Sequence, residues 1–385
     1  ALAGDKLTKG MLSLIENDKA QPSMESLNYI AEQLNVEVAE LVGGTNTSEL
    51  REVMNKAELI YNVEHEEDLE KYKKLLEMIE PYLNNFSKNY ESARLLTMYG
   101  IALYQEKLDG WEEYIQRAAD LSDEMNLTSN RAKIAVFRGL DKFVKHQYAE
   151  ALEIFLRERK AVEAQHSYID PLALLELDYH ESVLYFAVGK YDLALEVMGR
   201  AISLSKEKRI FYLINDLYRL ATVQAMDVGN KEKKDYYLQK LKLYGEFADH
   251  PQSIGFCNLI ELMTLTIDEK QYEKALILIE EFSLETREEY SFWLKAEKGK
   301  ALYYLGRYGE AFDILKDITT PDFLHHPYDL GMFYVLEPYK GLIQWELGNK
   351  EAALSFARTG VELFQTQPDC QFKQFSMQTL QKIEE

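Results

Sequence analysis

A short pattern that recurs along most of the chain is the feature that most constrains its fold. In its clearest copy, residues 183–202 read VLYFAVGKYDLALEVMGRAI. The pattern indicates the end of one helix, a tight turn at Gly189 and a second helix that carries Ala194 and Ala201 on one face. Two small residues at this spacing let two helix backbones come close. Each copy therefore predicts an antiparallel helical hairpin.

Turns equivalent to Gly189 recur at intervals of 36 to 43 residues. The seven turn residues are Lys107, His146, Gly189, Gly229, Lys270, Gly306 and Gly348. A mostly small residue precedes each turn by seven positions: Gly100, Gly139, Ser182, Thr222, Met263, Gly299 and Gly341. A Tyr follows four of the turns by two positions, and an Ala follows five of them by five positions. A fixed period of this kind predicts an array of stacked hairpins.

These offsets resemble those of the tetratricopeptide repeat, which places a small residue, a turn, an aromatic residue and an Ala in the same order. Its usual period is about 34 residues, so each helix here is expected to be about one turn longer. The resemblance implies an all-α fold in which the hairpins stack into a right-handed superhelical array with a concave wall. An irregular helical bundle that happens to repeat these turns is the alternative.

The composition limits the possible partners. The chain has 385 residues, of which 46% are hydrophobic, and a formal net charge of −21. This charge argues against a protein that coats nucleic acid, so any contact with DNA must be local. No apolar run approaches the ~20 residues that cross a bilayer, so no membrane partner is expected. Cys257 and Cys370 are isolated, which favours a reducing cytoplasm.

Residues 1–44 follow a different pattern from the repeats. Thr8 is expected to cap a helix over residues 9–16, and Ser23 a helix over residues 24–34. The run LTKGMLSLIENDKAQPSMESLNYIAEQLNVEVAELV resembles the second half of a Cro/lambda-repressor-type helix-turn-helix. In that family a Ser or Thr opens the recognition helix and a Pro-Ser starts the next one. The sequence begins at Ala1 in the middle of the pattern, so we expect this unit to be incomplete at its N-terminus.

The resemblance implies that the N-terminal part of the helix over residues 9–16 enters the major groove of DNA. It nominates Lys9, Gly10, Met11 and Ser13 as groove-facing residues, with Lys6 and Lys19 near phosphates. Residues 1–44 hold three Lys against seven acidic residues, whereas attraction to phosphates needs local positive charge. The alternative, that these residues are only the solvated side of a helix, stays open.

The chain is expected to have four parts: residues 1–44 as the helix-turn-helix, residues 45–89 as a linker and first hairpin, residues 90–368 as the repeat array, and residues 369–385 as a capping helix. In the second part, helices are expected over residues 49–62 and 65–80, with Pro81 ending the second. Pro171, Pro251 and Pro327 are each expected to begin a helix, and Pro338 to kink one.

No motif for catalysis or for a cofactor stands out. The sequence has no Walker loop, Gly-x-Gly-x-x-Gly, His-Glu-x-x-His or Cys-x-x-Cys. His325 and His326 are adjacent, make a poor ligand pair, and are expected in a loop after Pro321. Glu176 and His180 are spaced as a helix surface pair rather than an acid/base dyad. We therefore expect no enzyme activity, no cofactor and no metal site.

In a tetratricopeptide hairpin the first helix lines the concave side, and such a wall suits a short extended peptide. The candidate peptide contacts are Tyr179, Phe186, Asn215, Arg219, Asn258, Trp293, Lys300 and Tyr303. An Asn side chain can bind a peptide N–H and C=O at once, and Arg219 or Lys300 could take a carboxylate. The aromatic residues could instead form the core between repeats, and Asn215 could be a local helix cap.

A Cro-type helix-turn-helix followed by a long-period array resembles the RRNPP group of peptide-pheromone-responsive regulators of Gram-positive bacteria. The resemblance implies a cytoplasmic, homodimeric transcription regulator for quorum sensing, whose binding to a double-stranded DNA operator is controlled by a short linear signalling peptide. It implies that Asn215 and Asn258 hold the peptide backbone. Two alternatives stay open: a scaffold that binds another regulatory protein, and a DNA-binding regulator whose array only oligomerises.

Overall fold

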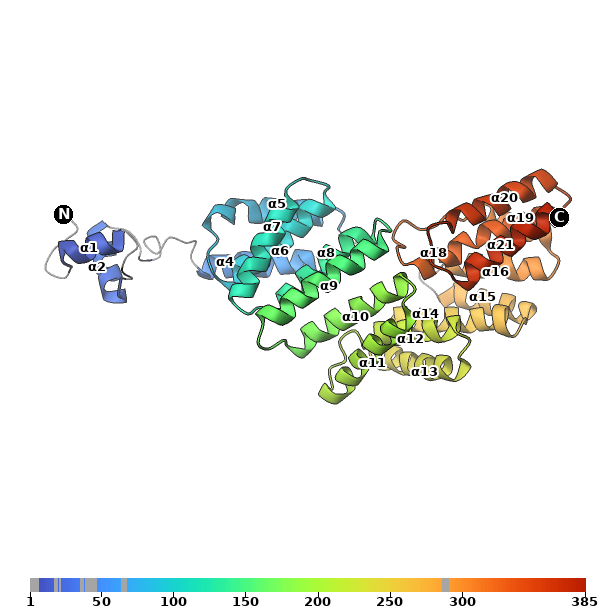
Figure 1. The fold of residues 1–385 in the computed structure, drawn as a ribbon, viewed down its shortest axis with the longest axis horizontal. Helices are drawn as coiled ribbons and strands as arrows, with labels where there is room; N and C mark the ends of the chain where they lie inside the picture. The colour runs from blue at the N-terminus through green and yellow to red at the C-terminus, as the bar shows by residue number, and fades with distance from the viewer. Residues whose placement is uncertain are drawn as a thin grey trace. The chain divides into compact units, whose positions relative to one another are not determined.

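A computed structural model describes the chain (Figure 1). The description covers residues 7–16, 20, 22–34, 38, 47–63, 68–285 and 291–385. Within these ranges every regular element is a helix and none is a strand. The all-α fold class predicted from the sequence is confirmed.

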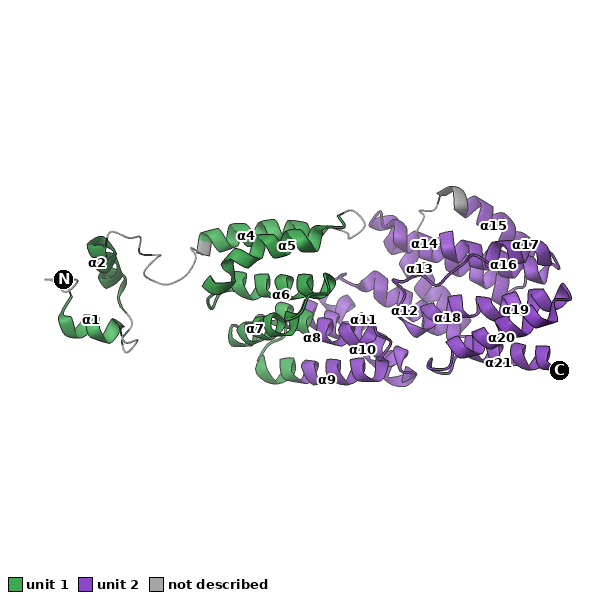
Figure 2. Cartoon of the chain, turned by 90° about the horizontal axis from the view of Figure 1, so that it is seen from above, with its two compact units in different colours: residues 1–134, 161–169 green, residues 135–160, 170–385 purple. Residues whose placement is uncertain are grey.

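The chain divides into two compact units (Figure 2). Unit 1 comprises residues 1–134 and 161–169, and unit 2 comprises residues 135–160 and 170–385. Two helices, α8 (Thr128–Phe143) and α9 (Tyr148–Gln165), therefore contribute residues to both units. The four parts expected from the sequence divide the chain by expected function and remain predictions.

The remaining helices of unit 1 lie before α8. They are α1 (Lys9–Glu16), α2 (Met24–Leu34), α4 (Thr47–Tyr61), α5 (Lys71–Ile79), the 3₁₀ helix η1 (Glu80–Asn85), α6 (Tyr90–Gln105) and α7 (Trp111–Glu124). Both expected N-terminal caps are present, because the Met11 N–H donates to Thr8 Oγ1 at 3.2 Å and the Ser26 N–H to Ser23 Oγ at 3.2 Å. The predicted helices over residues 9–16 and 24–34 are confirmed.

Unit 2 continues the alternation of helices to the C-terminus. It contains α10 (Pro171–Ala187), α11 (Tyr191–Lys208), α12 (Ile214–Asp227), α13 (Lys231–Phe247), α14 (Pro251–Met263), the π-helix η2 (Thr264–Asp268), α15 (Tyr272–Glu285), α16 (Ser291–Tyr304), α17 (Tyr308–Leu315), α18 (Pro327–Tyr334), α19 (Leu336–Glu346), α20 (Lys350–Leu363) and α21 (Gln371–Glu384). Successive helices pair as hairpins, among them α10 with α11, α12 with α13, α16 with α17 and α19 with α20.

All seven predicted turn residues have left-handed backbone conformations. Their φ angles are 57° at Lys107, 59° at His146, 73° at Gly189, 67° at Gly229, 53° at Lys270, 73° at Gly306 and 83° at Gly348. The residue after a turn then donates its N–H to a carbonyl five positions earlier, as Lys190 does to Tyr185 at 2.9 Å. This hydrogen bond and the positive φ are the signature of a Schellman helix end. The predicted hairpin turns are confirmed.

The turn at Lys270 differs from the others because η2 precedes it. There the Gln271 N–H donates to the Leu265 carbonyl at 2.9 Å, six positions earlier rather than five. A π-helix holds one more residue per turn than an α-helix. The sequence pattern carries no sign of this extra residue.

Close helix contacts explain why small residues precede the turns. A Cβ atom added to Gly341 in α19 would lie 3.0 Å from the Ala353 carbonyl oxygen in α20. A Cβ atom added to Gly100 in α6 would lie 2.8 Å from the Ile115 side chain in α7. The helices of these hairpins could not pack so closely with larger residues at these positions.

The helix boundaries near five prolines correct or confirm the predictions. The helix expected over residues 65–80 begins only at Lys71 within the described residues, and Pro81 lies in η1 rather than ending a helix at that point. The helix expected around Pro338 is interrupted at Val335, between α18 and α19, where the backbone stays right-handed helical (φ −64°, ψ −15°). Pro338 has no N–H to donate to the Tyr334 carbonyl, so an interruption within one turn before it agrees with the predicted kink. Pro171, Pro251 and Pro327 begin α10, α14 and α18 as predicted.

Candidate functional site

The predicted DNA-contacting residues that the structure describes lie on an exposed helix. Lys9, Gly10, Met11 and Ser13 are in α1, which has no buried residue. Met11 is 46% exposed. Lys6 and Lys19 lie outside the described residues, so Lys9 is the only basic residue of the set whose position is known. The set is thus accessible, with little positive charge of its own.

All eight predicted peptide contacts lie in unit 2, on the first helices of four successive hairpins. Tyr179 and Phe186 are in α10, Asn215 and Arg219 in α12, Asn258 in α14, and Trp293, Lys300 and Tyr303 in α16. The structure does not bring all of them to one cavity. Their surroundings differ and are described in the next paragraphs.

A polar group formed by α10 and α12 surrounds Arg219. The Arg219 guanidinium lies 3.6 Å from the Asp216 carboxylate and its centre lies 5.1 Å from the Phe256 ring centroid. Burial raises the pKa of Asp216, and the charge of Arg219 and a hydrogen bond from Asn215 oppose the rise. Arg219 is 41% exposed and could contact a ligand, but Asp216 already balances its charge.

Asn215 and Asn258 do not line one pocket. Asn215 is engaged with Asp216, its neighbour in α12. Asn258 lines a separate cavity of about 480 Å³ between α13 and α14, together with Lys234 and Glu261. The predicted pair of Asn clamps therefore has no single site in this structure.

Lys300 is buried and already paired. It is 7% exposed, and its ammonium forms an ion pair with Glu297, which is 1% exposed. The Thr266 hydroxyl donates to the same carboxylate at 2.8 Å. A ligand carboxylate would have to compete with this buried ion pair. Lys300 also lines a cavity of about 430 Å³ with Tyr304 and Tyr339, so its role in ligand binding stays a prediction.

The predicted aromatic contacts pack largely against other aromatic side chains. The Trp293 ring centroid lies 5.5 Å from that of Phe333, and the Tyr303 ring centroid lies 5.7 Å from that of Tyr339. Phe186 is 7% exposed. These contacts fit the alternative that the aromatic residues form the core between repeats. Phe186 also lines a pocket, which is described below.

The segment of residues 318–334, a loop followed by α18, lies against several first helices of unit 2. The Tyr148 hydroxyl donates to the His325 carbonyl at 2.8 Å, and the Phe143 ring lies 6.2 Å from the His326 ring. Phe323 contacts Trp293 at a centroid distance of 6.3 Å. The predicted loop position of His325 and His326 is confirmed, and His326 caps α18.

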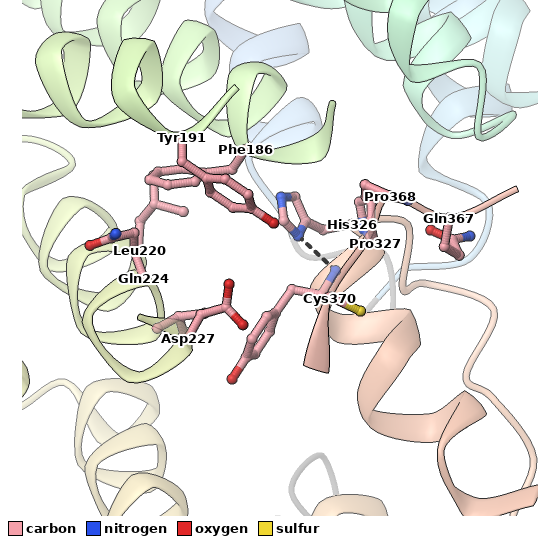
Figure 3. Close-up of a pocket in the computed structure, with 12 residues that line it drawn as sticks. Phe186, Tyr191, Leu220, Gln224, Asp227, His326, Pro327, Gln367, Pro368 and Cys370 are labelled. Atoms are coloured by element: carbon pink, nitrogen blue, oxygen red, sulfur yellow. Dashed lines mark hydrogen bonds between the residues drawn. The ribbon is translucent and has the colours of Figure 1, made fainter. Parts of the chain in front are cut away.

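The start of this helix forms one side of a small pocket, named here the Asp227 pocket (Figure 3). Its lining residues come from four separate segments: Phe186, Tyr191, Leu220, Val223, Gln224, Asp227, His326, Pro327, Tyr328, Gln367, Pro368 and Cys370. Its volume of about 40 Å³ is enough for about three water molecules or for one small chemical group. Figure 3 shows Leu220, Gln224 and Asp227 on one side and His326, Pro327 and Cys370 on the other.

Two polar groups that line the Asp227 pocket have unused hydrogen-bonding capacity. Burial raises the pKa of the Asp227 carboxyl, and among the described residues no cation or hydrogen-bond donor pairs with it. Gln367 is 5% exposed, and its Oε1 atom is buried without a partner. His326 is engaged on both sides, because its Nδ1 atom accepts the Tyr328 N–H at 3.2 Å and the ring also faces the Val183 backbone. Native proteins leave few such groups unpaired.

Sequence reasoning missed this pocket. Among the predicted peptide contacts, only Phe186 lines it. Asp227 lies two positions before the turn residue Gly229, and Gln367 lies in the connection before α21. A scan against models of known protein families found no match, and a search of curated proteins found none either.

Within the described residues, no helix is long and apolar enough to cross a membrane, and no cluster of three potential metal ligands occurs.

Proposed function

We propose that the protein is a transcriptional regulator of the RRNPP type, whose DNA binding is controlled by a short peptide held by its repeat array. The observation that carries the proposal is the Asp227 pocket, an apolar site between hairpins that holds a carboxylate without a cation partner among the described residues. The capped helices α1 and α2 support the DNA-binding part, because they match the spacing of a helix-turn-helix.

Ligand binding would act through the connections between hairpins. The Asp227 pocket joins the α10–α11 turn, the end of α12, the start of α18 and the connection before α21. A ligand that contacts all four segments stabilises one arrangement of these hairpins over others. In a repeat array, where each hairpin mainly contacts its neighbours, such small changes add along the chain.

The DNA-binding part is tested by retardation of DNA from the promoter region of the protein's own gene. We expect affinity to fall steeply with salt, and the double substitution Lys9→Ala with Ser13→Ala to weaken binding about tenfold or more. The control Lys382→Ala, at an exposed position of α21, removes the same charge and leaves affinity unchanged. If both variants bind as the wild type does, α1 is not the DNA-reading helix.

A scaffold that binds another protein is the second candidate, favoured by one surface feature. Tyr236, Leu243 and Phe247 lie along one face of α13 and are 43%, 52% and 90% exposed. Apolar side chains exposed together on one helix face are typical of protein interfaces. If the protein does not retard promoter DNA under any salt condition, this candidate replaces the first.

A further inference from the structure

We infer that the cavity lined by Lys300, Tyr304 and Tyr339, named here the Tyr304 cavity, binds a carboxylate attached to an aromatic group, and that its occupant is the C-terminal residue of a short peptide. The peptide as the source of this residue rests on the proposed function, whereas the class of ligand follows from the lining of the cavity. A free aromatic carboxylic acid shares this chemistry, and the test below separates the two sources.

The Tyr304 cavity has the size and the walls of a ligand site. Its volume is about 430 Å³, within the range of roughly 300 to 1,000 Å³ that is typical of such sites. Helices α15, α16, α19 and α21 line it with five aromatic residues: Tyr272, Tyr304, Tyr339, Phe372 and Phe375. Tyr272 stacks on Tyr304 with ring centroids 4.8 Å apart, and the Tyr339 centroid lies 4.9 Å from that of Phe375. These walls suit a flat, apolar group.

The charge of the lining favours an anion. Lys270 and Lys300 line the Tyr304 cavity, and none of its eleven lining residues, all of which the structure describes, is acidic. Glu297, the partner of Lys300, does not line it, so only the cationic member of this buried pair does. Lys270 is exposed and has no acidic partner among the described residues, so its charge is left for a ligand to balance.

Lys300 can donate to a ligand and keep its partner. Its ammonium has three N–H groups, and Glu297 is its one acceptor among the residues that the structure describes. The Thr266 hydroxyl donates to the other carboxylate oxygen of Glu297 at 2.8 Å, which holds Glu297 in place. A buried ammonium group with donors left over is unfavourable, and a ligand oxygen that accepts from it removes this penalty.

A pair of hydroxyl groups supplies a further donor. The hydroxyl oxygens of Tyr304 and Tyr339 lie 3.1 Å apart, and Tyr304 follows Lys300 by four positions on the same face of α16. Burial raises the pKa of Tyr339, so its hydroxyl keeps its proton at neutral pH. Two hydroxyls carry two protons and the bond between them uses one, so one proton is left for a ligand. Lys300 and the hydroxyl pair thus offer donors to the two oxygens of one carboxylate.

The position of the Tyr304 cavity favours a peptide over a single small molecule. Cys370 lines the Asp227 pocket, and the next two residues, Gln371 and Phe372, line the Tyr304 cavity. Helix α18 begins at Pro327, which lines the pocket, and Val335, which lines the cavity, follows its last residue. The 8 residues of α18 span roughly 12 Å, a distance that about four residues of extended chain cover. One short peptide can therefore reach both sites.

The test measures binding of the tetrapeptide acetyl-Ala-Ala-Ala-Phe, with a free C-terminal carboxylate, to the full-length protein by isothermal titration calorimetry. We expect the same peptide with a C-terminal amide to bind about tenfold or more weakly, because it lacks the charge that the two lysines bind. Replacing the terminal Phe with Ala should weaken binding by a similar factor, because the aromatic ring no longer leaves water.

A variant at Lys270 locates the carboxylate. Lys270→Asn should lower the affinity for the free acid about threefold and leave that for the amide unchanged. Position 270 is exposed, and Asn tolerates its left-handed backbone (φ 53°), so this variant should fold as the wild type does. The control Lys295→Gln removes a charge from an exposed position of α16 and should leave both affinities unchanged.

Equal binding of the free acid and the amide overturns the inference, as does binding of neither. An acid-to-amide ratio that is the same in Lys270→Asn as in the wild type would show that the carboxylate binds elsewhere. If N-acetylphenylalanine binds as tightly as the tetrapeptide, the cavity takes free aromatic acids and a peptide is not its occupant. Absence of promoter retardation in the earlier experiment, with the peptide results intact, would instead refute only the proposed function.

Discussion

At the scale of single residues, buried carboxylates in unit 2 differ sharply in their partners. Asp178 is 2% exposed and lies 2.7 Å from Arg159 and 2.8 Å from Arg200. Asp227 is half-buried and has no cation partner among the described residues. The paired carboxylate of Asp178 stabilises the fold, whereas an unpaired, partly buried carboxylate lowers stability. A carboxylate of the second kind is a candidate for ligand binding.

This cost predicts that Asp227→Asn stabilises the free protein. Because burial raises the folded-state pKa of Asp227, the folded protein binds the proton more tightly than the unfolded chain. Stability therefore falls as pH rises from the ordinary Asp value of about 4 through the folded-state pKa. We expect a gain of about 1 kcal/mol at neutral pH, which disappears near pH 4.

Urea unfolding of both proteins across this pH range measures the difference. The same substitution that stabilises the protein should weaken ligand binding, a trade-off that is common at binding sites. An Asn variant that is less stable than the wild type at neutral pH would show that the carboxylate has a structural partner.

The residues of the Asp227 pocket were not predictable from spacing along the chain. The pocket is lined by the end of α12 and by the connection before α21, which are separated by several hairpins, and no local pattern indicates that such distant segments line one pocket. The same limit applies to Lys300, whose charge suggested a ligand contact but whose partner Glu297 neutralises it. Sequence periodicity indicated which helices form the array, but not which polar side chains are satisfied within it.

At the scale of elements, the hairpin turns were predictable because their determinants are local. A left-handed residue, a following hydrogen bond and a small residue seven positions earlier all act within one helix end. The interruption at Val335 was predictable for the same reason, because Pro338 has no N–H to donate to the Tyr334 carbonyl one turn earlier.

The seam between α19 and α20 predicts the effect of Gly341→Val. The added Cβ atom would lie 3.0 Å from the Ala353 carbonyl oxygen and 3.3 Å from the Ala357 nitrogen, and backbone atoms cannot move aside as side chains do. We expect a loss of about 1–3 kcal/mol in the free energy of unfolding, measured in urea. Gly199→Val, in α11 with open space around it, should stay within about 0.5 kcal/mol of the wild type. Equal effects of the two substitutions would contradict the close seam.

At the scale of the whole molecule, the proposed DNA-reading helix and the Asp227 pocket belong to different units. Helix α1 is in unit 1 and the pocket is in unit 2. The chain passes between the units at residues 134–135, 160–161 and 169–170, in α8, in α9 and just before α10. Any coupling along the chain must use these connections, so we expect substitutions there to alter the response to ligand more than ligand affinity.

The most direct test measures the affinity of the full-length protein for promoter DNA with and without a pooled library of short peptides. We expect the library to change the DNA affinity of the wild type, and to change that of the Asp227→Asn variant much less. A wild-type affinity that is identical with and without the library would contradict peptide control of DNA binding.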